Sequence, residues 1–546
     1  MTFKNLWYRV FIIITFSMFT IVSLFFAFKV EPNYDLSLYL PNASNTKKGL
    51  EVLDDTFGID TQLQLMISDV SIVEALAYKS SIASLEGVDQ IIWIDDYVNL
   101  DLVPIEFVPN ELIDTFYKEQ HALFQIIIHK DAYDITIEQT ILDINEIITD
   151  HSFYMRGDAI NQIEARQIAS DEMFKVMFLI IPLIVLILII ASKSYIEPVI
   201  ILIVLGVAVL FNLATNLLIP NISFITMTLA IALQLAISLD YSLFLSHRYD
   251  EERRLGHPNI VAISNAFRHS FASITTSALT TIMSFVALFF MQYKIGLDIG
   301  LVLAKGVLFS YLTVMILMPV LLYVLTPLID ATQHRRFMPS LKRFGTLFYK
   351  VRFVMISFLL IFAVGSFIVS HQTNFLYGNV PNDNETRLVY QDQQAISNVY
   401  GYFEPTIIIF KSQTVSDEVL LYQHLLSMEQ VTSVDALINH VDPSIDRDLI
   451  PIELKQNYIF GDYQRFIILT NVTQENDAMF EFESQLRSHV DAHYDEFYVL
   501  GFSSALYDIK TSVNQDGIWV ILLSILCVGL VIGIAFKSFV VPILLI

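Results

Sequence analysis

The sequence predicts a polytopic α-helical membrane protein that carries two large α+β domains outside the cytoplasm. Its 546 residues are 54% hydrophobic with a mean hydropathy of +0.57, which is typical of an integral membrane protein. The apolar residues gather into runs long enough to cross a bilayer as helices. Two long polar blocks, 31–172 and 371–516, separate these runs. Motifs of the first half also recur in the second half at a nearly constant distance.

The charge distribution predicts how the chain is threaded through the membrane. Residues 31–172 carry a net charge of −20, the second block is also strongly acidic, and the remaining segments are net positive. Short basic loops stay in the cytoplasm, whereas long domains are translocated with little regard to charge. Both polar blocks are therefore expected outside the cytoplasm. The acidity also argues against a nucleic-acid partner, because such proteins present basic patches.

Eight membrane spans and the beginning of a ninth are expected in chain order. The first has no cleavage site after it and is read as an uncleaved span. The chain then divides into span one (1–30), a first outer domain (31–172), five spans (173–325), a basic cytoplasmic linker (326–352), span seven (353–370), a second outer domain (371–516) and a final segment (517–546). The apolar cores of the spans are Val10–Phe28, Phe174–Ala191, Pro198–Leu218, Ile225–Glu252, Phe271–Met291, Ile299–Leu325, Phe353–Ser370 and Ile518–Ala535, with Val540–Ile546 beginning the ninth.

The first polar block alternates strand and helix patterns. Alternating or short apolar runs predict strands at 61–68, 88–94, 124–129 and 153–157. Helical spacing of apolar residues predicts helices at 71–85 and 135–148. Strands that alternate with helices favour compact α+β units of the split βαβ kind.

An internal repeat relates the two halves of the chain. Six residues recur 344 positions later without a gap: Phe153, Tyr154, Gly157, Lys193, Ser194 and Pro198 reappear as Phe497, Tyr498, Gly501, Lys537, Ser538 and Pro542. Gly58 with Gly401, and Pro104-Ile-Glu106 with Pro451-Ile-Glu453, recur at nearby offsets. Parallel repeats of this kind are common in transporters, which form their sites where the repeats meet.

The fourth span carries the chemistry that stands out most. Asp240 lies inside an otherwise apolar run, where an aspartate costs at least a few kcal/mol on insertion scales and marks a functional candidate. Tyr241 follows it about 100° round the helix and so lies on another face. The alternative interpretation is a carboxylate that reaches cytosolic water or is satisfied by neighbouring hydroxyls.

Other polar residues in the spans are candidates to line a path near this pair. Gln234 and Ser238 lie on one side of span four, and hydroxyls of spans five and six could face them: Thr275, Thr276, Ser310 and Thr313. Such hydroxyls are also ordinary contacts between helices. Lys305 is expected to extend toward the outer surface. The pattern predicts no metal site, no cofactor and no catalytic residue, and the absence of a Walker-type lysine motif speaks against ATP as the energy source.

The segment Leu239-Asp-Tyr-Ser-Leu-Phe-Leu-Ser-His-Arg-Tyr-Asp-Glu-Glu252 resembles the MMPL branch of the RND superfamily. The resemblance implies a proton-driven exporter of lipids or other hydrophobic compounds across the bacterial cytoplasmic membrane, with porter-like outer domains and no enzymatic activity. It also implies that Asp240 and Tyr241 belong to a proton relay completed by an equivalent pair in span ten. The glycines that usually precede the pair are replaced here by Ala236-Ile-Ser-Leu239.

By the same resemblance the chain is expected to be C-terminally incomplete. Spans 9–12 would then be supplied in cis or by a separate chain, and the other expected partners are protons, membrane lipids, a hydrophobic or lipid substrate and, in a homo-oligomer, further copies. Two alternatives remain open at this stage. One is an accessory to protein secretion driven by proton flow, and the other is a lipid sensor or receptor that does not pump.

Overall fold

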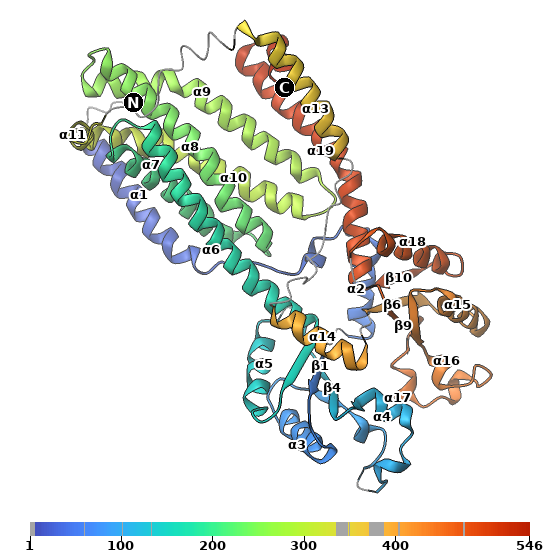
Figure 1. The fold of residues 1–546 in the computed structure, drawn as a ribbon. Coiled ribbons are helices and arrows are strands. Elements are labelled where there is room, and N and C mark those ends of the chain that lie inside the picture. The colour runs from blue at the N-terminus through green and yellow to red at the C-terminus, as the bar shows by residue number, and fades with distance from the viewer. Residues whose placement is uncertain are drawn as a thin grey trace. The chain divides into compact units, whose positions relative to one another are not determined.

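The computed structural model describes residues 6–546 apart from 59–60, 101, 133, 335–347, 349, 371–386, 402–403 and 473–474. The chain divides into two compact units (Figure 1). The first, here called the membrane unit, contains residues 1–33, 171–375 and 513–546. The second, here called the α+β unit, contains residues 34–170 and 376–512 and therefore holds most of both polar blocks.

Seven of the described helices are long and apolar enough to cross a membrane. They are α1 (Leu6–Ala27), α6 (Asp158–Ala191), α7 (Ile196–Thr215, extended to Leu218 by a 3₁₀ turn), α8 (Phe224–Arg254), α9 (Asn259–Ala287), α10 (Ile295–Val324) and α19 (Phe502–Phe536). Shorter helices of the same unit are α11 (Thr326–Ala331), α13 (Arg352–Ser370) and α20 (Val540–Leu545). Much of the basic linker expected at 326–352 lies outside the described residues.

Several helices begin well before the apolar runs that predict them. α6 begins at Asp158, directly after a strand that ends at Gly157, whereas the apolar core of the expected span begins at Phe174. α9 begins at Asn259, after Pro258 as N-cap, rather than at Phe271. Hydropathy detects only the part of a helix that lies in lipid, and polar first turns continue the same helix without that signal. The unit boundaries fall within α6 and α19, so each of these helices continues from one unit into the other.

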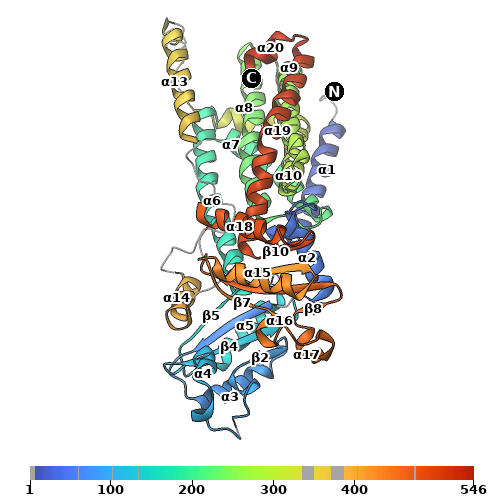
Figure 2. The same ribbon diagram turned by 90° about the vertical axis from the view of Figure 1, so that its right-hand side faces the viewer.

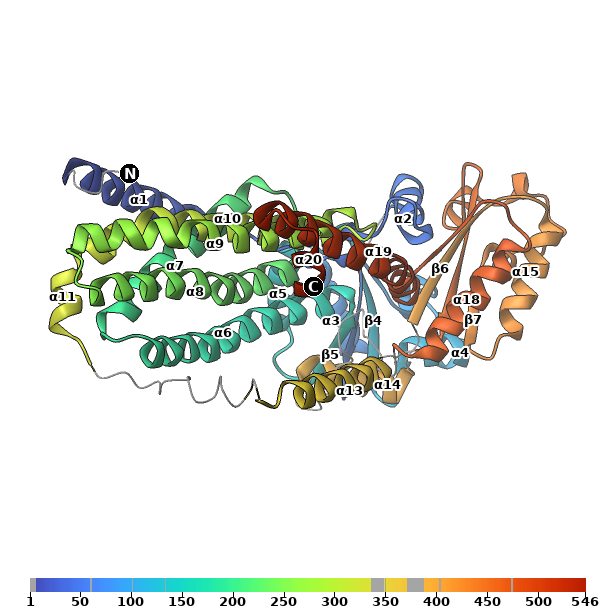
Figure 3. The ribbon, with the colours of Figure 1, turned by 90° about the horizontal axis from the view of Figure 1, so that it is seen from above.

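Helices α7 to α10 form the core of the membrane unit, with α10 the most buried of them. Figure 3 shows α8 between α9 and α6. Buried apolar side chains from four helices meet in this core, including Val204, Leu245, Ile274 and Val314. At Gly306 an added Cβ would lie 2.7 Å from Asn212 Nδ2, so the glycine permits α10 to approach α7 closely.

The first sheet of the α+β unit contains β1 (Thr61–Ile67), β2 (Gln90–Ile92), β3 (Tyr117–Lys118), β4 (His121–Ile128) and β5 (Phe153–Gly157). Its order is β2-β4-β1-β5, with β3 paired to β4 and all neighbours antiparallel. Strand β4 therefore lies between the parallel strands β1 and β2, which are joined by α3 (Ile72–Ala83). Strand β1 likewise lies between β4 and β5, which are joined by α5 (Thr136–Ile147). This is the split βαβ arrangement.

The second sheet repeats this order strand by strand. It contains β6 (Glu404–Lys411), β7 (Val431–Asp435), β8 (Ile459–Phe460), β9 (Tyr463–Thr470) and β10 (Phe497–Leu500), in the order β10-β6-β9-β7 with β8 on β9. Helices α15 (Val415–Ser427) and α18 (Asp477–Asp491) accompany it. The turn after the last strand also matches, because Gly157 and Gly501 have φ angles of +146° and +147° that a side chain rarely adopts.

Each sheet is covered in part by a helix from the other half of the chain. α2 (Asn45–Thr56) packs on the second sheet against β10, and α14 (Leu388–Tyr400) packs on the first sheet beside β5 (Figure 2). Smaller helices complete the unit: α4 (Asn110–Phe116), α16 (Leu437–His440) and α17 (Ile452–Lys455). The two sheets thus share one compact unit.

Candidate functional site: a membrane carboxylate on α8

Helix α8 presents a regular apolar stripe on the surface of the membrane unit, and Asp240 interrupts it. The exposed positions recur every three or four residues: Leu229, Leu233, Ala236, Asp240 and Phe244. Asp240 lies near the middle of the helix and is itself exposed. Within the part of the chain that the structure describes, no hydrogen bond or ion pair reaches its carboxylate. The stripe is therefore an exposed apolar face of α8 with one carboxylate in it.

Tyr241 lies on a different face of α8 and is only 3% exposed. Its hydroxyl has no hydrogen-bond partner among the described residues. The polar groups that lie toward it are Ser277 and Thr281 of α9. Asp240 and Tyr241 are thus neighbours in sequence whose polar groups have different surroundings.

The buried side of α8 carries a connected polar network that does not include Asp240. Gln234 donates through Nε2 to Gly306 O at 3.1 Å and to Ser310 Oγ at 3.2 Å on α10. Asn212 Nδ2 of α7 donates to Gln234 Oε1 at 2.9 Å, and the hydroxyls of Ser238 and Ser310 lie 2.5 Å apart. The network joins three helices through groups that are almost fully buried. It fixes the register of α7, α8 and α10.

Lys305 of α10 joins this network at the C-terminal end of α7, where its partly exposed side chain is held by two hydrogen bonds. Its ammonium donates to Asn216 Oδ1 at 2.6 Å and to the backbone carbonyl of Asn212 at 3.2 Å. Both groups belong to the C-terminal turn of α7 and the turn after it. The last carbonyls of a helix lack intrahelical partners and carry the negative end of its dipole, so they attract a cation there.

No hydrogen bond joins the remaining residues expected to line a path to Asp240 in the part of the chain that the structure describes. Thr275 of α9 lies 2.9 Å from the Tyr311 hydroxyl of α10. Thr313 bonds to carbonyls of its own helix, including Ser310 O at 3.2 Å. Thr276 is half-buried on α9. The structure therefore joins Gln234, Ser238 and Ser310 by hydrogen bonds, and among the described residues none of these bonds extends to Asp240.

A cluster of charges holds the end of α8 against α9. Glu252 is only 2% exposed and lies 3.2 Å from Arg248, while Asn265 of α9 donates to it at 3.0 Å. His269 Nδ1 lies 3.3 Å from the same carboxylate. Lys193, in the loop between α6 and α7, pairs with Asp250. Across the described residues, no group of three or more His, Cys, Asp or Glu side chains is placed to hold a metal ion.

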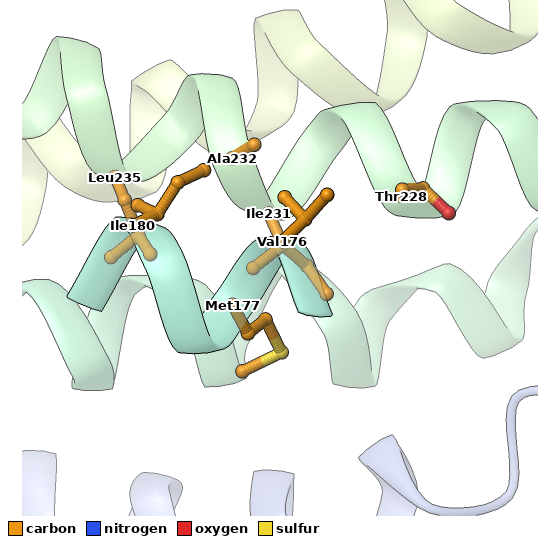
Figure 4. A pocket seen from close by; sticks show the side chains of 7 residues that line it. All are labelled: Val176, Met177, Ile180, Thr228, Ile231, Ala232 and Leu235. Carbon is orange, nitrogen blue, oxygen red and sulfur yellow. The ribbon is translucent and has the colours of Figure 1, made fainter. Parts of the chain in front are cut away.

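A small crevice lies between α6 and α8, at the level of Ile231 and Leu235 (Figure 4). Its walls are almost entirely apolar, with Val176, Met177 and Ile180 on α6 facing α8. Its volume is about 10 Å³, which is at the lower limit for a single water. The crevice marks loose packing between these two helices, and it is too small to hold a ligand.

Asn212 and Asn216 were not among the residues expected from the sequence. They lie four residues apart in an apolar span, which places them on one face of the helix and is the signal that could have identified them. Their partner Lys305 lies on α10, and only the packing of α10 on α7 brings the three together.

Comparison with known proteins agrees with the membrane helices described above. Residues 119–352, which run from the first sheet through α6 to α11, match the model of the MMPL family. A protein of Methanocaldococcus jannaschii, named "Putative membrane protein MJ1562", is 33% identical over 112 residues. That match covers 20% of this chain and about a quarter, 27%, of the length of the relative. Residues 119–352 of this multi-pass membrane protein therefore match the MMPL family, in agreement with the resemblance seen in the segment Leu239 to Glu252.

Proposed function

We propose that this protein is a proton-coupled transporter that exports lipids or other hydrophobic compounds across the cytoplasmic membrane. The observation that carries the proposal is Asp240, an unpaired carboxylate in the apolar exposed stripe of α8. An ionisable side chain at membrane depth is costly and is kept where it pairs, relays protons or lines a path. The MMPL match over the helices around it supports transport as the activity.

Protonation of Asp240 would change what the α8 stripe can contact. The ionised carboxylate only accepts hydrogen bonds and needs water or a polar partner. The protonated form is neutral and carries an O–H donor, so contact with an apolar surface costs much less. Because the other stripe positions in this region are Ala236, Leu233 and Phe244, the carboxylate alone would decide between the two kinds of contact.

Tyr241 is proposed to take part in proton transfer on the buried side of α8, where its hydroxyl can accept one hydrogen bond and donate another. Its buried hydroxyl has no partner among the described residues, and a phenol is both donor and acceptor. Ser277 and Thr281 of α9 lie on that side. The pair would thus connect the stripe with the α8–α9 interface, in keeping with the relay that the resemblance implies.

The α+β unit is proposed to lie outside the cytoplasm and to receive the exported compound. Its position between spans whose short connecting segments are basic supports this placement. Helices α6 and α19 are continuous through the boundaries of the units.

The test is transport by purified full-chain protein in liposomes with an imposed pH gradient. Proton uptake is read with an internal pH dye, and export with a fluorescent hydrophobic compound. Asp240→Asn keeps the shape but cannot titrate, so both signals should fall to the level of empty liposomes. Glu251→Gln removes a carboxylate from the same side of α8 near its cytoplasmic end and is the matched control. Wild-type activity of Asp240→Asn contradicts the proposal.

A further inference from the structure

The matching order of the two sheets allows their surfaces to be compared position by position. In the first sheet Gln64 of β1 pairs with Gln125 of β4 and with Arg156 of β5, which forms a polar row across three strands. In the second sheet the corresponding row is Ile407 of β6, Ile467 of β9 and Leu500 of β10. Arg156 and Leu500 are 344 positions apart, as the repeat requires. One half therefore carries polar groups where the other carries apolar ones.

In the second sheet the apolar row is ordinary core under a helix. Ile407 and Leu500 pack with Leu53 and Phe57 at the end of α2. Phe460 of β8 completes this contact, with its ring 6.3 Å from that of Phe57. The architecture is therefore compatible with an apolar row that is closed by the covering helix.

In the first sheet the polar row is left open. α14 packs its Ile396 against Met66 and Leu123, but a cavity of about 470 Å³ remains beside its C-terminal end. Gln64, Gln125 and Arg156 line the cavity, together with Lys118, Asp114 and Tyr400. Lys118 occupies the position on β3 that Phe460 occupies on β8. The volume is within the range of ligand pockets in proteins.

The two cations of the cavity are held in place by the surrounding protein. Arg156 donates through Nε to Gln64 Oε1 at 2.5 Å and through Nη1 to Gly401 O at 2.9 Å. Lys118 Nζ donates to Val399 O at 3.0 Å. Among the described residues that line the cavity, Arg156 and Lys118 are cations and Asp114 is a carboxylate, in a block with a net charge of −20. This described lining is therefore more basic than the block around it.

Both cations also contact the C-terminal turn of α14, so a purely structural role as helix caps has to be weighed. The corresponding helix α2 has no basic residue in its last turn and meets Phe460 where α14 meets Lys118. At this helix end a cation from β9, Arg465, lies over the ring of Phe57 at 4.6 Å from its centroid, whereas the position on β8 that corresponds to Lys118 holds the apolar Phe460. The polar row and its open cavity are not needed for the packing alone.

We propose that this cavity binds a phosphate monoester carried on a small hydroxylated group. The guanidinium of Arg156 and the ammonium of Lys118 suit the phosphate oxygens, and the amides of Gln64 and Gln125 suit hydroxyl or ester oxygens. Leu123, Val399 and Tyr400 supply an apolar wall. Either a free sugar or glycerol phosphate or the headgroup of a single-chain phospholipid has this chemistry. The inference concerns binding alone and does not depend on proton coupling.

The test is equilibrium binding to the purified full chain in a neutral detergent at low salt. The probes are radiolabelled sn-glycerol 3-phosphate and 1-oleoyl lysophosphatidic acid, with glycerol as the uncharged control. Arg156→Gln and Lys118→Gln should each weaken binding about tenfold or more, since each removes a charge-assisted contact. Lys411→Gln removes one exposed cation from the second sheet of the same unit and should bind as the wild type. The triple variant Gln64→Ile, Gln125→Ile, Arg156→Leu installs the apolar row of the second sheet and should abolish binding.

The outcomes separate the two sources of the phosphate and decide the proposal. Equal affinity for both probes supports a free phosphate monoester, and at least tenfold tighter binding of the lipid supports a headgroup. Lys118 is exposed, so Lys118→Gln remains a fair test if loss of Arg156 loosens α14. The proposal is overturned if the wild type binds neither probe, if Lys118→Gln binds as the wild type, or if Lys411→Gln loses as much affinity.

Discussion

Asp392 and Asn45 accept hydrogen bonds from equivalent backbone N–H groups in the two halves of the α+β unit. Each of the two side chains comes from a helix that belongs to the other half of the chain. Asp392 Oδ2 of α14 accepts a hydrogen bond from Met155 N at 3.1 Å, and Asn45 Oδ1 of α2 accepts one from Val499 N at 2.8 Å. Met155 and Val499 lie 344 positions apart on the edge strands β5 and β10. Covering an edge in this way prevents further strands from pairing with it.

The carboxyl of Asp392 should make stability depend on pH. Burial raises its pKa above 3.8, and the hydrogen bond from Met155 N only partly offsets this. The folded state therefore holds the proton more tightly, so the contribution of this carboxyl to stability is fully present below pH 3.8 and is lost as the pH rises through the raised pKa. Asp392→Asn should lose this slope in thermal unfolding curves recorded from pH 4 to 7. Identical slopes for variant and wild type would show that the raised pKa has no effect on folding.

The reciprocal change at Asn45 should introduce the same behaviour in the other half. In the wild type, Asn45 Nδ2 donates to Phe497 O at 2.8 Å. Asn45→Asp keeps the acceptor for Val499 N but loses this donor. We expect a lower unfolding temperature, by an amount equivalent to about 1 kcal/mol for the lost bond, and a new decrease with rising pH. Asn45→Ser is the control, because its shorter side chain gives up both contacts without adding a charge.

Arg487 should be the most sensitive position of the contact between α2 and the second half. It donates to Glu483 at 2.7 Å and to Asp508 at 2.6 Å, and Asp508 accepts the backbone N–H of Thr46 at 2.9 Å. Burial acts to lower the pKa of Arg487, but the two carboxylates raise it. Arg487→Met leaves these carboxylates buried and unpaired, which should cost about 3–5 kcal/mol. Thermal unfolding of the full chain measures this, with Arg487→Lys expected to lose less.

The Gln234 network should stabilise the membrane unit without taking part in proton transfer. Gln234→Leu leaves Asn212 Nδ2 and Ser310 Oγ with one partner fewer in a buried place, which should cost about 1–3 kcal/mol. Proton uptake per folded molecule should stay at the wild-type level, because Asp240 lies outside the network. A loss of uptake with unchanged thermal stability would instead place Gln234 in the proton path.

Topology is testable with single cysteines. Ser80→Cys on α3 and Ser416→Cys on α15 are both exposed, and Cys527→Ser removes the native thiol. If the α+β unit lies outside the cytoplasm, a membrane-impermeant maleimide labels both in intact cells. Val261→Cys, between Arg254 and Arg268, should react only after permeabilisation. Labelling in the opposite sense at any of the three sites rules out this topology.

Local patterns were enough to predict the individual elements. The strands at 61–67 and 153–157 and the helix at 136–147 follow from spacing within a few residues of their own positions. Apolar runs likewise predict α7, α8 and α10 closely. These signals depend on neighbouring residues in the chain, which is why they are visible in the sequence.

Features that depend on distant parts of the chain were not predicted. Helices α2 and α14 each pack on the sheet of the other half, which joins residues such as Met155 and Asp392. The local sequence around either residue does not identify the other. The partners of Lys305, Asn212 and Asn216, likewise become apparent only when α10 packs on α7. The strands β3 and β8 are two residues each, too short for periodicity to detect.

Helices α2 and α14 also set an order for maturation during synthesis. When β10 emerges, α2 has long been made, so the edge at Val499 can be covered at once. The edge at Met155 must wait for Asp392, which follows 237 residues later in the chain. Throughout that interval an unpaired strand edge is available to wrong partners, which is the usual route to misassembly of nascent chains. The first sheet is therefore the part of this protein whose newborn form most needs protection by chaperones.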